Sequence, residues 1–419
     1  MVPVPLDGPA DQVGRIWGGT ARVGPAPTPD RVLVSDLPTP ALLVDRARLQ
    51  SNLDAMQARA EVHGVALRPH VKTHKCVEIA RLQAARGARG LTVATVDEAE
   101  AFPAAGFDDV RLATPVVGAG KLGRLAALAG DGVRVSFSVD SATGVRRAAE
   151  AFADAPAEVL IEIDTGYGRC GVRWDDAPAL TSLAAAVRQS GLVLAGLLSH
   201  GGDAYTPAAD GETADGARRR AMTAERDRVL AAAVTLAQAG LLAPGAELSV
   251  GSTPGLTAFE NREVAVGNAG RDGFRITEVR PGTYAFMDAT QVALGAARLQ
   301  DCALVCVGTV VSKRRFDDGT ERVVTDAGKK VLTSDLRPGS ETFGDVLYSP
   351  HTMIAHPHAV VSGLSEEHGW VDTPGGAIWD VGDPVFVVPN HACVAVATRR
   401  QLHVVEGDEV TDVWDVVAR

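Results

Sequence analysis

Apolar runs of strand length alternate with amphipathic helical stretches between residues 66 and 285. Helical patterns rich in Ala and Leu separate most of the apolar runs, at 118–129, 141–153, 177–190 and 214–239. Eight buried strands alternating with helices favour a TIM-type (β/α)8 barrel. A doubly wound open sheet is the competing arrangement, but Lys72-Thr73-His74-Lys75 stands where its glycine-rich turn is usual. The predicted strands are 66–72, 90–95, 110–114, 133–139, 158–164, 192–200, 247–253 and 278–285.

The two ends of the chain follow other patterns. Residues 1–36 are rich in Pro and Gly, with one short strand expected at 31–34. A strand at 41–44 stops at Asp45, which is a good N-cap for a helix that closes at Gly64. After residue 293 the apolar runs are short and β-branched, and no helix of three turns is evident. We therefore expect an N-terminal extension (1–36) that can complete the β domain, a barrel (37–293) and an all-β domain (294–419) whose runs include 303–311, 322–325, 384–388 and 393–397.

Composition narrows the class of protein. A chain of 419 residues with 46% hydrophobic and 22% charged residues is typical of a soluble enzyme with more than one core. The net charge of −11 gives no basic surface for nucleic acid, and no apolar run is long enough to span a membrane. The first residues lack a signal-peptide pattern, and five cysteines, an odd number, favour a reducing compartment. These features predict a cytoplasmic enzyme with a small-molecule substrate and without nucleic-acid or membrane partners.

The first predicted barrel strand leads into two lysines and two histidines. Desolvation and neighbouring positive charge would lower the pKa of Lys72 and make its amine a nucleophile toward a carbonyl group. A basic, solvated strand end is the alternative. The local sequence does not choose between Lys72 and Lys75.

Polar residues also end other predicted strands. Because the carboxyl ends of barrel strands share one face, their concentration there predicts an active site. Gly251-Ser252-Thr253 offers backbone N–H groups and hydroxyls suited to a phosphate. Arg169 is a candidate partner for a carboxylate or phosphate, or a surface arginine. His200 and Tyr205 are candidates for contact with an aromatic cofactor, although His200 is nearly as well explained as a core histidine. Further polar residues at strand ends are Thr95, Asp97, Glu98, Asp164, Ser199 and Thr283.

The predicted β domain carries Pro389-Asn390-His391-Ala392-Cys393. On a strand, His391 and Cys393 would point to the same face and could bind one metal ion, and two ligands leave positions open for catalysis. A buried cysteine beside a core histidine is the alternative. Further ligand candidates are His351, His356, His358 and His368, the last in a polar loop at 365–369.

These motifs together resemble the D-serine dehydratase and D-threonine aldolase family of fold-type III pyridoxal-phosphate enzymes. The resemblance covers about residues 37–400 in the family's order. It implies an alanine-racemase-like barrel joined to a β domain, usually as a homodimer with active sites near the interface. The matching segments are 68–75, 164–172, 200–205, 251–253, 280–284, 365–369 and 389–393.

The resemblance also implies roles for single residues. Lys72 would be the lysine bound to pyridoxal phosphate, with Tyr205 near the pyridine nitrogen. Arg169, His200 and Tyr284 would belong to the cofactor site. His391 and Cys393 would hold a divalent metal, which is zinc in the dehydratases. Gly251, Ser252 and Thr253 would contact the phosphate.

His391-Ala392-Cys393 looks like the dehydratase form of the metal motif, whereas the aldolases of the family tend to have His-Cys-Asp there. A thiolate ligand favours zinc over manganese or magnesium. We therefore expect a lyase in which Lys72 removes the Cα proton of D-serine or a related β-hydroxy D-amino acid, giving a 2-keto acid and ammonia. The alternatives are retro-aldol cleavage to glycine and an aldehyde, and a non-catalytic protein that binds pyridoxal phosphate.

Overall fold

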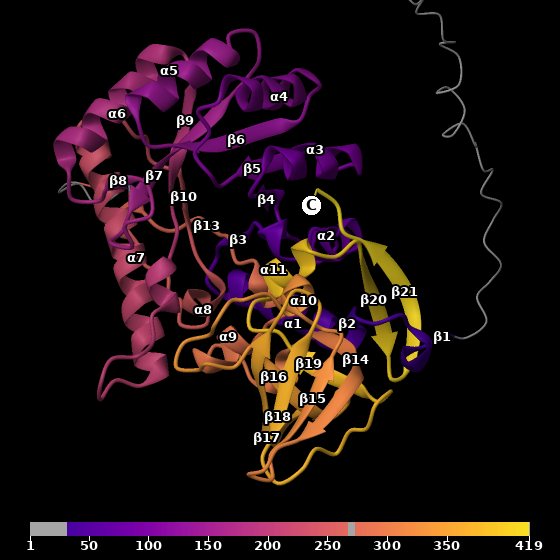
Figure 1. Ribbon diagram of the computed structural model, residues 1–419. Helices are drawn as coiled ribbons and strands as arrows, with labels where there is room; N and C mark the ends of the chain where they lie inside the picture. The colour runs from indigo at the N-terminus through magenta and orange to yellow at the C-terminus, as the bar shows by residue number, and fades with distance from the viewer. Residues whose placement is uncertain (1–31, 267–272, 419) are drawn as a thin grey trace, which may run out of the picture.

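The protein is built on two large sheets, one parallel and one antiparallel (Figure 1). The computed structural model describes residues 32–266 and 273–418. The parallel sheet and its long helices run from indigo to magenta in Figure 1, and most of the antiparallel sheet is orange to yellow. The predicted combination of an α/β part and a C-terminal β part is therefore present.

Eight parallel strands form the first sheet, in the order β3-β13-β10-β9-β7-β6-β5-β4. A parallel bridge between His70 and Thr92 joins the two ends of this order. The arrangement is consistent with the predicted barrel. Each of these eight strands overlaps a predicted apolar run, whereas the short strand β8 (Val172–Arg173) was not predicted. The strands of the sheet are β3 (Ala66–Leu67), β4 (Leu91–Val93), β5 (Asp109–Leu112), β6 (Arg134–Val139), β7 (Glu158–Asp164), β9 (Val193–Ser199), β10 (Glu247–Val250) and β13 (Glu278–Val279); β8 (Val172–Arg173) pairs with β7.

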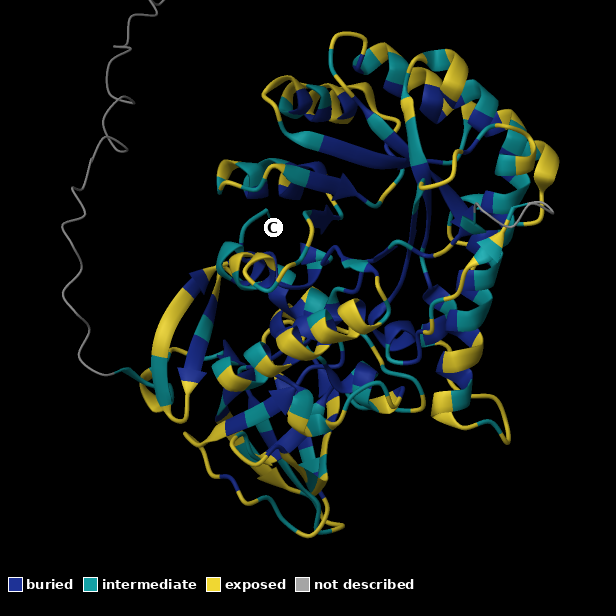
Figure 2. Ribbon diagram, turned by 180° about the vertical axis from the view of Figure 1, so that it is seen from behind, coloured by how far each residue is buried: buried dark blue, intermediate teal, exposed yellow. Residues whose placement is uncertain are grey.

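Helices follow the strands and turn their polar faces outward, as the exposed outer surfaces in Figure 2 show. Their starts are set by side-chain caps: Asp45 accepts a hydrogen bond from the Arg48 backbone N–H at 2.8 Å, and Thr213 accepts one from Gly216 at 3.0 Å. The helices of this part are α1 (Arg46–Val62), α2 (Val77–Ala84), α3 (Val96–Ala104), α4 (Ala119–Gly130), α5 (Ala142–Ala151), α6 (Ala177–Ser190), α7 (Ala214–Gln238), α8 (Thr253–Leu256) and α9 (Ala289–Ala293), with a small hairpin of β11 (Val264–Ala265) and β12 (Gly273–Phe274).

A buried ion-pair network lies inside the parallel sheet. Arg68 donates to Glu278 at 2.7 Å and to Asp109 at 2.6 Å, while Arg111 binds the other oxygen of Glu278. Burial alone would raise the pKa of Glu278, but the charges of Arg111 and Arg68 lower it to about 2. The carboxylate is therefore held ionised in the interior of the sheet.

The antiparallel sheet takes in the first described residues as well as the C-terminal part. Ala41–Asp45, which the sequence places with the barrel, instead pairs with β14 (Leu304–Arg315) along one edge and with β20 (Gln401–Glu406) along the other. The predicted strand at 31–34 is observed at Val32–Leu33, where it pairs with β21; residues 1–31 lie outside the described residues. The strands are β1 (Val32–Leu33), β2 (Ala41–Asp45), β14 (Leu304–Arg315), β15 (Glu321–Thr325), β16 (Asp345–Ser349), β17 (Ile354–Leu364), β18 (Gly369–Thr373), β19 (Pro384–Val388), β20 (Gln401–Glu406) and β21 (Glu409–Asp415).

Two short helices interrupt the antiparallel part, α10 (Lys329–Leu332) and α11 (Ala392–Ala397). The prediction of a strand at 393–397 is therefore wrong. The Ala-rich sequence favours a helix, and Asp288 accepts a hydrogen bond from the Ala392 backbone N–H at 3.0 Å at its start. No helix within the described ranges is both long and apolar enough to cross a membrane.

Candidate active site

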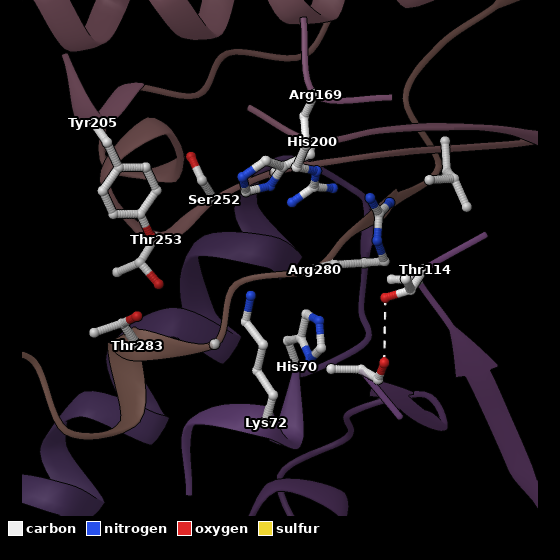
Figure 3. Close-up of a pocket in the computed structure, with 15 residues that line it drawn as sticks. His70, Lys72, Thr114, Arg169, His200, Tyr205, Ser252, Thr253, Arg280 and Thr283 are labelled. Atoms are coloured by element: carbon white, nitrogen blue, oxygen red, sulfur yellow. Dashed lines mark hydrogen bonds between the residues drawn. The ribbon is translucent and has the colours of Figure 1, made fainter. Parts of the chain in front are cut away.

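Lys72 projects into a cavity at the carboxyl ends of the parallel strands, as Figure 3 shows. It lies in the short 3-10 turn η2 (Val71–Thr73) that follows β3. The backbone N–H of His70 donates to the Pro281 carbonyl at 2.9 Å and so fixes the chain just before this turn. We call this cavity the lysine cavity; it is lined by His70, Lys72, Ala94, Ala113, Thr114, Arg169, Leu198, His200, Tyr205, Gly251, Ser252, Thr253, Arg280, Gly282 and Thr283.

Lys75, the rival lysine, is directed elsewhere. Its ammonium pairs with the buried carboxylate of Glu98 and donates to the Ala418 carbonyl at 2.8 Å. The Val417 backbone N–H returns a hydrogen bond to the Lys75 carbonyl at 2.7 Å. Glu98 and the C-terminal residues thus hold Lys75 away from the lysine cavity, and Lys72 is the lysine that faces it.

The turn after β10 fits an anionic group. Gly251 has φ 129°, a value that residues other than Gly rarely adopt. Its backbone N–H donates a hydrogen bond to Glu225 at 3.0 Å. The Ser252 hydroxyl is buried without a hydrogen-bond partner among the described residues and lines the lysine cavity. A buried polar atom of this kind favours a ligand that bonds to it. Of the predicted phosphate residues, Ser252 has an unpartnered hydroxyl, and the Thr253 hydroxyl accepts from the Tyr284 N–H at 3.1 Å but keeps its own O–H to donate, whereas the Gly251 N–H is already bonded to Glu225.

The opposite wall of the lysine cavity is rich in nitrogen. Burial lowers the pKa of His200 to about 3, assisted by the charges of Arg169, Lys72 and Arg280. Burial and the charge of Lys72 also hold the pKa of His70 well below its usual range. Both imidazoles are therefore neutral at pH 7, and the positive charge of this wall comes from the lysine and the two arginines.

The predicted tyrosines have different positions. Tyr205 lines the lysine cavity, where desolvation raises the pKa of its hydroxyl. Tyr284 lies outside the cavity lining: it is 1% exposed, and its hydroxyl accepts a hydrogen bond from Gln83 at 2.9 Å. Its neighbour Thr283 faces the cavity instead, because the chain forms a 3-10 turn there and not a strand.

His391 and Cys393 come from the antiparallel part of the molecule and lie near Lys72, although neither lines the lysine cavity. The Cys393 sulfur lies 3.1 Å from the Thr73 hydroxyl, next to Lys72 in the chain. His391 caps the start of α11, and its Nδ1 lies 2.6 Å from Asp335 Oδ2. His391 and Cys393 therefore lie at the start of a helix, and not on a strand as the sequence predicted.

The electrostatics of the pair suit metal binding. Burial by itself raises the pKa of the Cys393 thiol, yet contacts with His391, Lys72 and Thr73 bring it below its ordinary value. Burial lowers the pKa of His391, but Cys393, Asp288 and Asp335 together raise it to about 10. These shifts favour a thiolate–imidazolium pair, and a metal ion that displaced the imidazolium proton would meet a thiolate and an imidazole, which are ligands that zinc prefers. Within residues 32–266 and 273–418, no group of three or more His, Cys, Asp or Glu side chains is arranged to hold a metal ion.

The other predicted ligand candidates lie elsewhere. His351 pairs with Asp408 at 2.9 Å, and His356 stacks against Tyr348 with ring centroids 5.8 Å apart. The loop at 365–369 packs against α10, where the Ser365 carbonyl accepts from Lys329 at 2.8 Å. Neither His358 nor His368 lines the lysine cavity.

Several site residues were missed by the sequence interpretation. His70 and Arg280 belong to matching motifs, yet only the structure places their side chains in the lysine cavity. Asp335 is far from His391 in the chain and carries no local motif, so nothing in the sequence indicated their contact. Glu225 in α7 accepts from the Ser199 hydroxyl at 2.6 Å and from the Gly251 N–H, and so ties β9 to the turn after β10.

Both halves of the chain match known families. Residues 44–290 match the alanine racemase N-terminal domain, and residues 303–405 match the serine dehydratase domain. The chain is 34% identical over 387 residues to the D-threonine aldolase of Arthrobacter sp., covering 91% of this chain and 92% of the aldolase. It is 33% identical over 399 residues to the D-threo-3-hydroxyaspartate dehydratase of Delftia sp. (strain HT23), covering 90% of this chain and 97% of the dehydratase.

A solved structure supports the same relationship. A D-threo-3-hydroxyaspartate dehydratase in the metal-free form, with one cysteine replaced by alanine, matches the fold with a TM-score of 0.81 and 31% identity. The match covers 93% of this chain and 100% of that one.

Proposed function

Because the chain belongs to the D-serine dehydratase and D-threonine aldolase family of fold-type III pyridoxal-phosphate enzymes, we propose that it is a metal-dependent dehydratase. Its substrate is D-serine or a related β-hydroxy D-amino acid, and its products are a 2-keto acid and ammonia. The observation that supports this proposal is the 3.1 Å contact of the Cys393 sulfur with Thr73, the residue that follows Lys72.

Lys72 would hold the cofactor through its Nζ, which faces the lysine cavity and, as a free amine, would accept the Cα proton of the substrate. Pyridoxal phosphate, when bound, would supply the sink for the electron pair left at Cα. Ser252 would contact its phosphate, while Arg169 and Arg280 would offer positive charge to anionic groups.

His391 and Cys393 hold the metal. The ion, most simply zinc because of the thiolate, supplies Lewis-acid stabilisation of the leaving β-hydroxyl. Asp335 orients the His391 ring through the contact at Nδ1. Lys72 and the metal pair therefore act on neighbouring atoms of the substrate, Cα and the oxygen on Cβ.

Retro-aldol cleavage is the second candidate, because the chain is similar to a D-threonine aldolase over nearly its whole length. In that reaction a base takes the β-hydroxyl proton and the Cα–Cβ bond breaks. Cys393 favours the dehydratase, since a soft thiolate selects zinc over the harder ions that suit carboxylate sites. We also propose that the protein is a homodimer and is located in the cytoplasm.

Product analysis tests the proposal. Purified protein loaded with pyridoxal phosphate and zinc is incubated with D-serine and with D-threonine, and 2-keto acid, ammonia, glycine and aldehyde are measured. We expect 2-keto acid and ammonia in equal amounts, and no product from Lys72→Ala. Glycine and aldehyde without keto acid would establish the aldolase instead, and the absence of every product would favour a non-catalytic protein.

A further inference from the structure

Lys75, the lysine that stays outside the lysine cavity, closes the turn that carries Lys72. The Val71 carbonyl accepts hydrogen bonds from the His74 N–H at 3.1 Å and from the Lys75 N–H at 2.7 Å, so residues 71–75 form one closed turn. Lys75 has φ 47°, a left-handed conformation that residues other than Gly rarely adopt and that persists where the surroundings impose it. The contacts that hold Lys75 therefore bear on where Lys72 lies.

The side chain of Lys75 ties this turn to the neighbouring strand of the parallel sheet. Its ammonium pairs with Glu98, and the two side chains are only 10% and 1% exposed. The second carboxylate oxygen of Glu98 accepts the Ala94 N–H at 2.6 Å, and Ala94 follows β4 and lines the lysine cavity. Apolar residues of similar size often stabilise a fold as much as a buried ion pair does, so the specific contribution of this pair is the geometry that it imposes.

The segment 416–418 binds the same turn from the antiparallel part of the molecule. It continues from β21, and the yellow end of the chain reaches α2 and α3 (Figure 1). Its first N–H donates to the Arg400 carbonyl at 2.8 Å, just before β20. The Val417 N–H donates to the Lys75 carbonyl at 2.7 Å, and the Ala418 carbonyl accepts from the Lys75 ammonium at 2.8 Å. Both the backbone and the side chain of Lys75 are thus held by this segment.

We propose that Lys75, Glu98 and residues 416–418 form a clasp that positions Lys72 in the lysine cavity. We call it the tail clasp, and Lys75 and Glu98 are its positioning residues. The inference rests on the proposed function, which it deepens by giving the second lysine a role. The clasp holds the Lys72 amine where it can condense with the aldehyde of pyridoxal phosphate, forming a C=N bond and releasing water. A small displacement of a reacting group slows such a step strongly.

Two variants loosen the tail clasp from different sides. Lys75→Met combined with Glu98→Gln removes both charges together, so that no unpaired charge stays buried, and the glutamine keeps an acceptor for the Ala94 N–H. Val417→Pro removes the N–H that bonds to the Lys75 carbonyl and leaves the ion pair in place.

The rate of cofactor attachment is the first measurement. Apoprotein is mixed with pyridoxal phosphate and quenched with borohydride at timed intervals, and the pyridoxyl label on Lys72 is quantified. The temperature is one at which circular dichroism shows each variant to be folded. We expect labelling about tenfold slower and kcat about tenfold lower in both clasp variants, with KM within about twofold of the wild type. A merely structural role would lower the unfolding temperature and leave the labelling rate unchanged.

A second Lys–Glu pair supplies the matched control. Lys313 lies 3.4 Å from Glu321, which accepts the Ala377 N–H at 2.9 Å, and neither charged residue lines the lysine cavity. Lys313→Met combined with Glu321→Gln therefore makes the same chemical change away from Lys72. It should keep the labelling rate within about twofold of the wild type.

Hydrogen exchange tests the tail clasp without the cofactor. In the apoprotein, the amides of His74 and Lys75 should exchange at least about tenfold faster in the clasp variants than in the wild type, because their bonds to Val71 open more often. The amides of β7 should exchange at the wild-type rate.

An unchanged labelling rate and kcat in the folded clasp variants, or an equal loss in the control pair, would overturn the tail clasp. If the double variant does not fold, Val417→Pro alone decides. If the wild type takes up no pyridoxal phosphate, the proposed function fails separately. Hydrogen exchange then decides the clasp: faster exchange in the variants upholds it, and equal exchange refutes it.

Discussion

The contact between Asp335 and His391 gives a prediction that is independent of turnover. Asp335 Oδ2 lies 2.6 Å from His391 Nδ1, and the two side chains are 44% and 41% exposed. A carboxylate bonded to one ring nitrogen orients the imidazole and makes the other nitrogen a better metal ligand. Asp335→Asn keeps the size of the side chain and removes its charge, so it should weaken metal binding without emptying the cofactor site.

The magnitude follows from this geometry. Loss of such a supporting carboxylate typically costs about 10- to 100-fold in metal affinity, equivalent to about 1.4–2.7 kcal/mol. Because both side chains are partly exposed and solvent screens their interaction, we expect the lower end, about tenfold. Zinc affinity is measured by competition with a chromophoric chelator, on protein loaded with pyridoxal phosphate.

A matched control separates this effect from a general loss of charge. Asp408→Asn removes a carboxylate from a second Asp–His contact, with His351 at 2.9 Å, and neither residue lines the lysine cavity. It should leave zinc affinity within about twofold of the wild type. Equal zinc affinity in Asp335→Asn and wild type, or an equal loss in both variants, would refute the reasoning.

Three further predictions concern the ligand pair, the C-terminal contact and pH. Cys393→Ala should lower zinc content and leave cofactor content unchanged. The control Cys302→Ala, in the core of the β part, should retain zinc. Metal and cofactor analysis after dialysis checks both variants. Glu98→Gln leaves the Lys75 ammonium buried without its counter-ion and should lower the free energy of unfolding by about 3–5 kcal/mol in urea denaturation; a loss below about 1 kcal/mol would contradict it. Burial lowers the pKa of His74 from 6.5 to about 3 in the folded protein. As the pH falls below 6.5, His74 therefore binds a proton in the unfolded chain but not in the folded protein. This histidine should destabilise the fold by about 2 kcal/mol at about pH 5, and His74→Gln should reduce the fall in stability between about pH 7 and 5; an unchanged slope would contradict the assignment.

The apolar pattern predicts the parallel part of the molecule well for a physical reason. Strands that are buried on both faces, such as 192–200, are nearly continuous apolar runs, and capping residues such as Asp45 mark where helices begin. It is harder to predict which sheet a strand joins. Ala41–Asp45 has the composition of a barrel strand, yet it pairs with strands that lie more than 250 residues further along the chain.

The candidate site is predictable where its residues lie in local motifs. Lys72, Arg169, Tyr205 and Ser252 lie in the segments that follow strands, and the structure brings them to one cavity. Tyr284 shows the limit: one residue's difference in a 3-10 turn sends Thr283 into the cavity and Tyr284 into the core. The contact of Asp335 with His391 depends on how a loop packs, which no spacing along the chain reveals.

Covalent trapping of the cofactor tests the central claim most directly. The wild-type protein, loaded with pyridoxal phosphate, is reduced with borohydride, digested and mapped by mass spectrometry. The account predicts the pyridoxyl label on Lys72, because Lys72 faces the lysine cavity while Lys75 is bound to Glu98. A label on Lys75 or on another lysine, or no label at all, would contradict it.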